Sequence, residues 1–416
     1  KDRKELLIED CLRDGLGINH TNLLATIADR CNDTIKMVVD CGCEFVPNHM
    51  LFEGGHSVPR SYEIKAGSGS GYIRPMHAEL KKIKNVVIRT RAKFDDFIVS
   101  DDKSEVLGVT YRSGYRFNNK LVSDDLENKT GKSPTVRAKL GVMLAAGGFS
   151  RDIWFRQIQD PRVVPSTDST NQPGATAELW RETSRIGCAQ VQNDWIQCTP
   201  WNSPKEKGMG LGWTFSQSGA AEFGLWVNTA GKRFVDELAN RKVRADAIMV
   251  EQNKGLRAVA ICTEANLKSY NVARPGMLKK LLESGVVKQY KTLADIAADY
   301  KMPADVLAKT VETFNKAVKD RKDPEFNRIM NPEQVPLVDG PWYAAEMSPK
   351  VHHCMGGLVT DMQCRVMDIS TSKPVPGLFA AGEATSGVHG AVRLGSCAIL
   401  DCLVNGRIAG QEAAKA

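Results

Sequence analysis

Two apolar stretches that each end in a glycine turn, at residues 139–149 and 377–383, constrain the fold of this chain most strongly. The first carries Ala-Ala-Gly-Gly at 145–148, and the second carries Ala-Ala-Gly-Glu at 380–383. An apolar run followed by glycine is typical of a strand entering a tight turn, and such strands joined by helices form an α/β sheet. Glycine also lets backbone amides approach a phosphate or a planar ring. Either turn alone is explained as well by an α/β turn without a ligand.

The segment between the two turns has a different character over residues 198–344. It holds glycine- and tryptophan-rich stretches and then a helical run over 292–320, where Leu307, Val311 and Phe314 keep helical spacing. A chain of 416 residues is long enough for two domains. We therefore predict a discontinuous sheet domain, residues 1–197 and 345–416, with a lid-like α+β capping domain of residues 198–344 inserted into it.

The N-terminal part is predicted to mix helices and short strands. Residues 1–50 are expected to be helical, with the clearest apolar periodicity over 22–40, and a further helix is expected over 74–82. Short strands are expected over 85–90 and 105–111.

Composition excludes several classes of protein. The net charge of +7 comes with no long block of basic residues, which disfavours nucleic-acid binding, although a mild excess of positive charge helps to attract anionic substrates. No apolar run approaches the roughly 20 residues that a membrane helix needs. The eleven cysteines form no CxxC or CxxCH motif, so no haem or iron–sulfur spacing is recognisable. Unpatterned thiols favour a reducing compartment.

Two further segments carry candidate functional residues. Residues 387–399 place Arg393 among small residues just before an apolar helix. A glycine-rich helix N-terminus favours anionic groups, and an arginine fork binds a carboxylate. Residues 352–357 begin with His352 and His353, which have no acidic or cysteine partner at metal-ligand spacing. For these histidines, a buried structural role and a contact to substrate or flavin are both open, and we predict no metal site.

The order of these elements resembles the fumarate reductase family of flavoproteins, which includes flavocytochrome c fumarate reductases, urocanate reductase and other enoate reductases. The resemblance extends over nearly the whole chain. It is carried by residues 174–176, 228–237, 323–326, 352–357, 380–383 and 387–399. It implies an FAD-binding Rossmann-like domain with an inserted capping domain, and FAD held without a covalent bond.

One feature of the family is not found in this sequence. Family members open with a strand and a GxGxxG turn that holds the FAD pyrophosphate. The resemblance implies that the intact protein carries this first βαβ unit and that the chain binds FAD poorly without it. It also implies an electron donor, which would be a cytochrome, a flavin domain or an NADH-linked partner, on another part of the protein or on a separate subunit.

The resemblance assigns roles to individual residues. In the family, flavin N5 delivers a hydride to one alkene carbon and an arginine protonates its neighbour. Arg241 takes the place of that arginine, while Arg393 and His353 clamp the substrate carboxylate. Contacts to substrate are further expected from Thr199, Ser216, Gln217 and Gly390. Contacts to the cofactor are expected from Ala146, Gly147, Gly148, Gly174, Thr176, His352, Gly382, Glu383, Arg393, Ser396, Ala398 and Ile399.

The chain departs from the family on the substrate side. Thr199 stands where fumarate reducers have a histidine for the second carboxylate. Gln217 and Ala220 stand where they have an acid and an arginine that relay protons to the catalytic arginine. We therefore favour a monocarboxylic enoate, such as an acrylate derivative, over fumarate. Trp195 and Trp201 would pack a substrate substituent or lie in the core.

Two other functions are consistent with the sequence. One is a flavin dehydrogenase that oxidises a ketosteroid, a hydroxy acid or a tricarboxylic acid. Steroid-type members use tyrosines in place of the Arg/His clamp, so Arg241 and Arg393 disfavour that branch. The other is a degenerate flavoprotein that carries electrons without catalysis. The family resemblance favours a periplasmic protein, whereas the cysteine content favours a cytoplasmic one.

Overall fold

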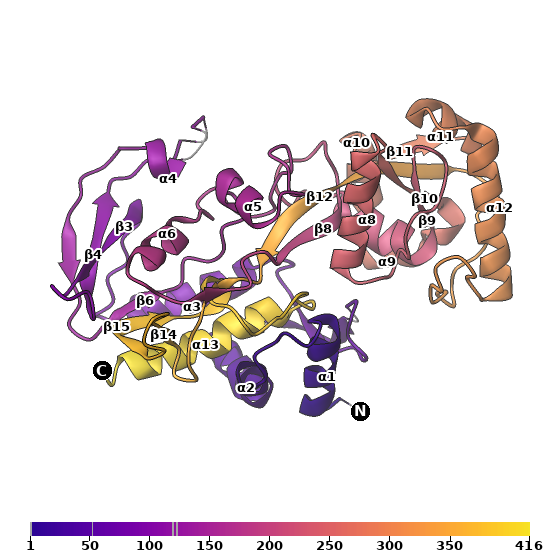
Figure 1. Cartoon of the computed structure of the whole chain (residues 1–416). Coiled ribbons are helices and arrows are strands. Elements are labelled where there is room, and N and C mark those ends of the chain that lie inside the picture. Colours follow the sequence, from indigo (N-terminus) through magenta and orange to yellow (C-terminus); the bar gives the residue numbers. More distant parts are fainter. Residues whose placement is uncertain (1, 52, 119, 122–123) are drawn as a thin grey trace. The chain divides into compact units, whose positions relative to one another are not determined.

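The computed structural model describes residues 2–51, 53–118, 120–121 and 124–416 (Figure 1). The chain divides into two compact units. The first comprises Lys1–Pro161, Pro173–Ile196 and His353–Ala416, and the second comprises Arg162–Gln172 and Gln197–His352.

The centre of the first unit is a three-stranded sheet in the order β14 (Arg365–Met367), β15 (Pro374–Ala380) and β6 (Val142–Leu144). β15 pairs with β6 in parallel, with Leu378 opposite Val142. Because parallel strands end at the same edge of a sheet, the two glycine turns predicted from the sequence follow strands that finish side by side.

Helices pack around this sheet. α13 (Cys397–Ala413) and α2 (Thr21–Asp40) share a buried apolar cluster that includes Leu23, Ile27 and Val404. α1 (Lys4–Asp14) precedes α2, and α2 and α3 (Ser70–Lys82) flank the hairpin of β1 (Phe45–Leu51) and β2 (Ser61–Ile64) in sequence. The helices predicted over 22–40 and 74–82 are thus confirmed. Residues 45–50, which we expected to be helical, belong to β1 instead.

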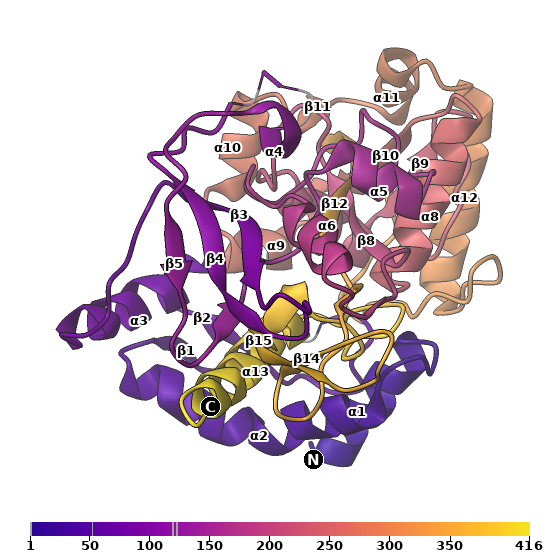
Figure 2. The ribbon, with the colours of Figure 1, turned by 60° about the vertical axis from the view of Figure 1, so that its left-hand side comes forward.

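Figure 2 shows a separate small antiparallel sheet of the first unit, formed by β3 (Ala92–Val99), β4 (Val106–Ser113) and β5 (Thr135–Arg137). β4 confirms the strand predicted over 105–111. The strand predicted over 85–90 is wrong, because those residues pair with no other strand and the side chain of Val87 is 74% exposed. The remaining elements of this unit are α4 (Asp124–Glu127), α5 (Ile153–Gln159), α6 (Glu178–Arg185), and the short pair β7 (Gln190–Val191) and β13 (Gly357–Leu358).

The second unit is a five-stranded sheet with helices on both faces (Figure 1). Its strands follow the order β11 (Lys288–Tyr290), β12 (Trp342–Cys354), β10 (Ala258–Thr263) and β9 (Leu225–Asn228), and β8 (Ile196–Asn202) also pairs with β12. Successive side chains of a strand point to opposite faces. In β9, Trp226 therefore lies in one core cluster, while Leu225 and Val227 lie in the other.

Each face of this sheet has its own helices. α8 (Arg241–Asn253), α9 (Lys268–Ala273) and α10 (Met277–Glu283) supply the core that contains Trp226. α11 (Leu293–Tyr300) and α12 (Ala304–Asp320) supply the other. The helical run predicted over 292–320 is divided between these two helices, because Pro303 lies between them and lacks the N–H that a continuous helix needs. The expected domain boundary at 344/345 falls inside β12, which is one uninterrupted strand.

Within the described part of the chain, no helix combines the length and the apolar character required to cross a bilayer.

Candidate active site

Two glycine turns follow the parallel strands β6 and β15 at the carboxyl edge of the sheet in the first unit. Gly147 and Gly382 adopt positive φ angles of 80° and 70°, which favour glycine. A Cβ atom at Gly382 would lie 2.8 Å from the Cys402 sulfur, and one at Gly148 would overlap the carboxylate of Glu383. Ala146 lies in the first of these turns. Gly148 and Gly382 are buried, whereas Ala146 is exposed and a Cβ at Gly147 would meet open space, so the first turn has room for a flat or phosphorylated cofactor.

Glu383 is a largely buried carboxyl group beside the second turn. It accepts a hydrogen bond from the backbone N–H of Cys354 at 2.9 Å, and its Oε1 lies 3.6 Å from His353 Nδ1. Burial raises the pKa of Glu383 to about 7, against the opposing effects of the Cys354 N–H and the charge of Arg393. A carboxyl group with such a pKa exchanges protons near neutral pH.

A chain of polar side chains leads from Glu383 towards α13. The rings of His353 and His389 meet edge to face, with centroids 5.3 Å apart. His389 Nε2 lies 3.1 Å from Asp401 Oδ2, and Asn405 Nδ2 donates to Asp401 Oδ1 at 2.7 Å. Both histidines and Asp401 are buried. Sequence reasoning missed His389, Asp401 and Asn405, although for Asp401 and Asn405 their position within the apolar run after Arg393 was a signal.

The segment from 387 to 399 lies at the N-terminus of α13, where backbone dipoles favour an anion. Arg393 is 5% exposed, and its Nη1 donates to the Leu394 carbonyl at 3.1 Å. Gly390 has a φ of 60°, and a Cβ there would lie 2.5 Å from the Gly15 carbonyl. Ser396 precedes the helix with a φ of 62°. Ala398 and Ile399 lie in the first turn of the helix.

Three other residues that we predicted to contact the cofactor lie outside these turns and outside α13. Gly174 and Thr176 lie in the loop before α6, joined by a 2.9 Å hydrogen bond from the Thr176 N–H to the Gly174 carbonyl. His352 belongs to the second unit, and its Nδ1 lies 2.7 Å from the Thr170 hydroxyl. His352 and His353 are consecutive on β12, so their side chains point in opposite directions.

In the second unit, Arg241 is the first residue of α8. Asn240 caps this helix by accepting a hydrogen bond from the Val243 N–H at 3.1 Å. The guanidinium carbon of Arg241 lies 5.3 Å from the ring centre of Trp201, within the range of a cation–π contact. Trp201 itself is 5% exposed and belongs to the core cluster that contains Trp226.

The predicted substrate contacts of the second unit differ in accessibility. Ser216 and Gln217 begin a π-helix, Ser216–Ala221, in which Ser216 is buried and Gln217 is half-buried. Thr199 is 1% exposed, and its hydroxyl donates to Asn202 Oδ1 and to the Lys350 carbonyl. Ala220 is fully buried in the core. Of the two tryptophans noted in the sequence, Trp201 is buried and Trp195 is half-buried.

The predicted residues therefore fall into two sets, one in each unit. The first unit brings together His353, Glu383 and the segment of Arg393, and the second places Arg241 on the ring of Trp201, with Gln217 joined to the same ring through Arg244. That Arg241 and Arg393 act on one substrate remains a prediction. Among the described residues, no cluster of three or more His, Cys, Asp or Glu side chains could hold a metal ion.

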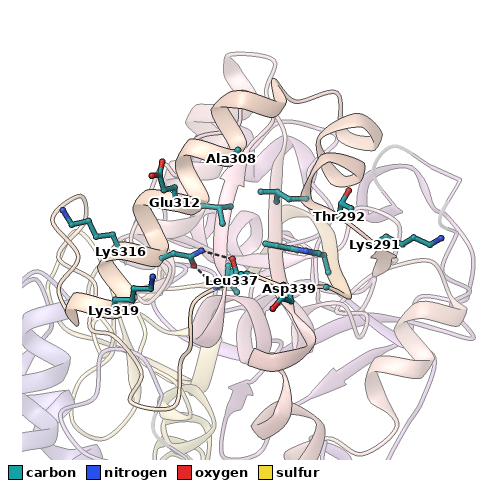
Figure 3. A pocket seen from close by; sticks show the side chains of 14 residues that line it. Lys291, Thr292, Ala308, Glu312, Lys316, Lys319, Leu337 and Asp339 are labelled. Carbon is teal, nitrogen blue, oxygen red and sulfur yellow. Dashed lines mark hydrogen bonds between the residues drawn. The ribbon is translucent and has the colours of Figure 1, made fainter.

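A cavity of about 750 Å³ lies elsewhere in the second unit, on α12 (Figure 3). Its lining includes Thr292, Glu312, Lys316 and Asp339. None of the predicted site residues lines it. This cavity therefore does not mark the candidate active site.

Comparison with known families defines the class of the protein. A family model described as an FAD binding domain matches residues 1–399. The predicted α/β fold, an FAD-binding Rossmann-like domain with a capping domain, is confirmed by this match and by the similarity to a solved structure reported below. The chain is a flavoprotein of the oxidoreductase class.

Individual relatives narrow this class. The chain is 35% identical over 412 residues to the acrylate reductase flavoprotein subunit of Shewanella woodyi, covering 98% of this chain and 78% of that protein. It is 30% identical over 416 residues to a fumarate reductase (cytochrome) of Shewanella frigidimarina, covering 100% of this chain and 66% of that protein. It therefore belongs to the fumarate reductase family of flavoproteins.

A solved structure has the same fold. The open conformation of a flavocytochrome c3 fumarate reductase superposes with a TM-score of 0.77 at 28% identity. The superposition covers 100% of this chain and 68% of that chain. The chain thus spans about two-thirds of the length of the fumarate reductases it matches.

Proposed function

We propose that this protein is an FAD-dependent reductase of the C=C bond of a small α,β-unsaturated monocarboxylate related to acrylate. The observation that carries this proposal is the half-exposed guanidinium of Arg241, held over Trp201 at the start of α8. A cation fixed on an apolar ring suits an anionic substrate with a short carbon chain. The similarity to a protein named as an acrylate reductase subunit supports the same substrate class.

The first unit has features that would contribute to holding FAD without a covalent bond. The turn at Gly147 leaves open space at the carboxyl edge of the parallel strands, and the N-terminus of α13 favours a phosphate or a polarised carbonyl group. Glu383 adds a carboxyl group that titrates near neutral pH. Reduced flavin, when bound there, supplies the hydride.

The chain's own residues supply the rest of the reaction. Arg393 binds the substrate carboxylate through its planar fork of donors, which withdraws electron density from the alkene. Arg241 gives up an N–H proton to the α-carbon as the new C–H bond forms, and water later restores that proton. An arginine is a weak acid in water, so it acts only when held tightly against a strongly basic carbanion.

The surroundings of Thr199 support a substrate with one carboxylate. Its hydroxyl is neutral, 1% exposed and already donates to Asn202 and to the Lys350 carbonyl. A second carboxylate would need a cation or free donors at this position. Burying a carboxylate there without them would cost several kcal/mol.

A panel of enoates tests the proposal. We expect the full-length, FAD-loaded protein to oxidise reduced methyl viologen anaerobically with acrylate or methacrylate. We expect kcat/KM for these substrates to be at least about tenfold higher than for fumarate, since one unpaired carboxylate lowers affinity by more than 1.4 kcal/mol. Preference for fumarate would overturn the monocarboxylate assignment, and no turnover with any enoate would overturn the reductase.

Exposure leads us to exchange the roles that the resemblance gave to the two histidines. His353 is 4% exposed and contacts Glu383 and His389, so we assign it to the flavin side. His352 is half-buried, so a substrate can reach it, and we assign it to substrate binding.

Alanine replacements separate the two histidines. We expect His352→Ala to raise KM for the enoate about tenfold, because one hydrogen bond to the substrate is lost. The flavin absorbance should not change. We expect His353→Ala to reduce the flavin content of the purified protein, because Glu383 and His389 lose a buried partner. Flavin absorbance per protein and steady-state KM measure both effects. The reverse pattern would restore the roles implied by the resemblance.

The electrons must come from a donor that this chain does not contain in recognisable form. The Shewanella frigidimarina relative is named as a cytochrome-type fumarate reductase. We propose a cytochrome, flavin domain or NADH-linked partner as the donor here.

A further inference from the structure

Arg244 is a buried arginine that the proposed function does not use. It lies one turn after Arg241 on α8 and is 3% exposed. Its Nη1 donates to Gln217 Oε1 at 2.6 Å and to the Glu237 carbonyl at 2.9 Å. Its guanidinium carbon lies 4.7 Å from the ring centre of Trp201, the same indole that carries Arg241.

No carboxylate neutralises this charge directly. In the described part of the chain, no Asp or Glu oxygen lies within 4.0 Å of the Arg244 guanidinium. Its two acceptors are a neutral amide and a backbone carbonyl, and its buried Nε has no hydrogen-bond partner. Burying a charge without an ion-pair partner costs several kcal/mol.

Other buried arginines of the same unit are treated differently. Arg233 and Arg328 are also almost fully buried, but both pair with the carboxylate of Glu237, at 2.8 and 3.0 Å. Both of these buried arginines thus form a direct ion pair with a carboxylate. Arg244 makes no such direct pair, although Asp236 and Glu237 act on its charge from further away, and Arg241 lies three positions away on the same helix face as a like charge.

We infer that Arg244 is a positioning residue that makes Arg241 a proton donor, by placing a second fixed positive charge beside it on Trp201. This inference rests on the proposed reductase function and identifies what supports its acid. Gln217 and Ala220 stand where fumarate reducers have an acid and an arginine that relay protons, and Arg244 would support the catalytic arginine in their absence. Gln217 accepts the hydrogen bond that holds Arg244 in place.

The physical reason is repulsion between like charges, one of which, on Arg244, is buried and therefore little screened by water. A cation beside a guanidinium disfavours its protonated form and so makes it a better acid. The same charge stabilises the carbanion that receives the proton. Burial and the charge of Arg241 lower the pKa of Arg244 to about 9, whereas Asp236 and Glu237 act in the opposite direction. Arg244 keeps its own proton near neutral pH, and the proton lost by Arg241 returns from water.

Variants of Arg244 test the inference in the full-length, FAD-loaded protein. We expect Arg244→Met to lower kcat about 100-fold, with KM for the enoate little changed. Removing the neighbouring charge raises the proton affinity of Arg241, so the alkaline limb of the kcat–pH profile should move to higher pH. Arg244→Lys keeps the positive charge. We expect the alkaline limb of its kcat–pH profile to lie at the wild-type pH, and its kcat to recover in part. Arg257→Met, which removes an arginine from the Tyr300 ring of the same unit, is the matched control with unchanged kcat.

The thermal midpoint provides a second readout. Because Arg244 is buried without a counter-charge, we expect Arg244→Met to unfold at the same or a higher temperature than wild type. A structural role for Arg244 would give a different set of results. Arg244→Met would then lose kcat with a lower thermal midpoint and an unmoved alkaline limb, and Arg244→Lys would recover no kcat. These results would overturn the inference. Unchanged kcat in Arg244→Met would overturn it alone. No enoate turnover by the wild type would instead overturn the proposed function, and this inference with it.

Discussion

Replacing Arg241 with methionine is expected to lower kcat for enoate reduction by about 10⁴-fold, the upper range for loss of a general acid. Methionine keeps the length of the side chain and favours a helix, so α8 should still form. The folded protein loses the cation–π contact of Arg241 to Trp201, worth about 0.5–1 kcal/mol at an accessible site. Anaerobic oxidation of reduced viologen measures the rate.

The flavin spectrum and a lysine variant separate catalysis from structure. Arg241 lies in the second unit, whereas the glycine turns and the N-terminus of α13 lie in the first, so Arg241→Met should retain full flavin absorbance. Arg241→Lys keeps a charge but lacks the planar fork, and we expect it to recover only a small part of kcat. Turnover within tenfold of wild type in Arg241→Met, or loss of the flavin, would remove Arg241 from the role of proton donor.

The sheet elements beside the predicted cofactor site could be predicted because glycine marks them directly. Gly147 and Gly382 need positive φ angles, and the apolar runs before them pair as β6 and β15. The strand predicted over 85–90 failed because its β-branched residues find no partner strand, which no local pattern reveals. The thirteen residues of β12 were missed because they carry Pro, Lys and two histidines within an otherwise buried strand.

The candidate site could be predicted only in part, because contacts between segments distant in the sequence determine which of its polar residues are buried. The sequence has three basic residues within the four positions 241–244, a density of charge that is typical of a solvated face. Burial of Arg244 depends on Trp201 and Gln217, which come from distant segments. His389 and Asp401 are similarly linked by the fold and not by their spacing in the sequence.

The capping unit depends on a buried ion-pair network that joins two of the sequence motifs, 228–237 and 323–326. Glu237 is fully buried and pairs with Arg233 at 2.8 Å and Arg328 at 3.0 Å. Arg233 also pairs with buried Asp323 at 2.8 Å, and with Glu325, whose side chain is 43% exposed, at 3.2 Å. Burial alone would raise the pKa of Glu237, but the charges of Arg328 and Arg233 outweigh this and lower it.

Replacing Glu237 with glutamine is therefore expected to destabilise the protein by about 3–5 kcal/mol, because two buried guanidinium groups lose their shared counter-charge. This corresponds to a fall of about 6–20 °C in the thermal midpoint of a unit of this size. Glu325→Gln is the matched control, since it removes a carboxylate from the same Arg233 at the surface and should cost less than about 1 kcal/mol. Because the folded pKa of Glu237 is lowered, its contribution is complete above the ordinary value of 4.5 and is lost as the pH falls through the folded pKa. The difference between wild type and Glu237→Gln should thus be full at neutral pH and shrink in acid. Equal midpoints for the two variants at pH 7 would mean that packing around Arg233, and not the buried charge pair, holds these motifs together.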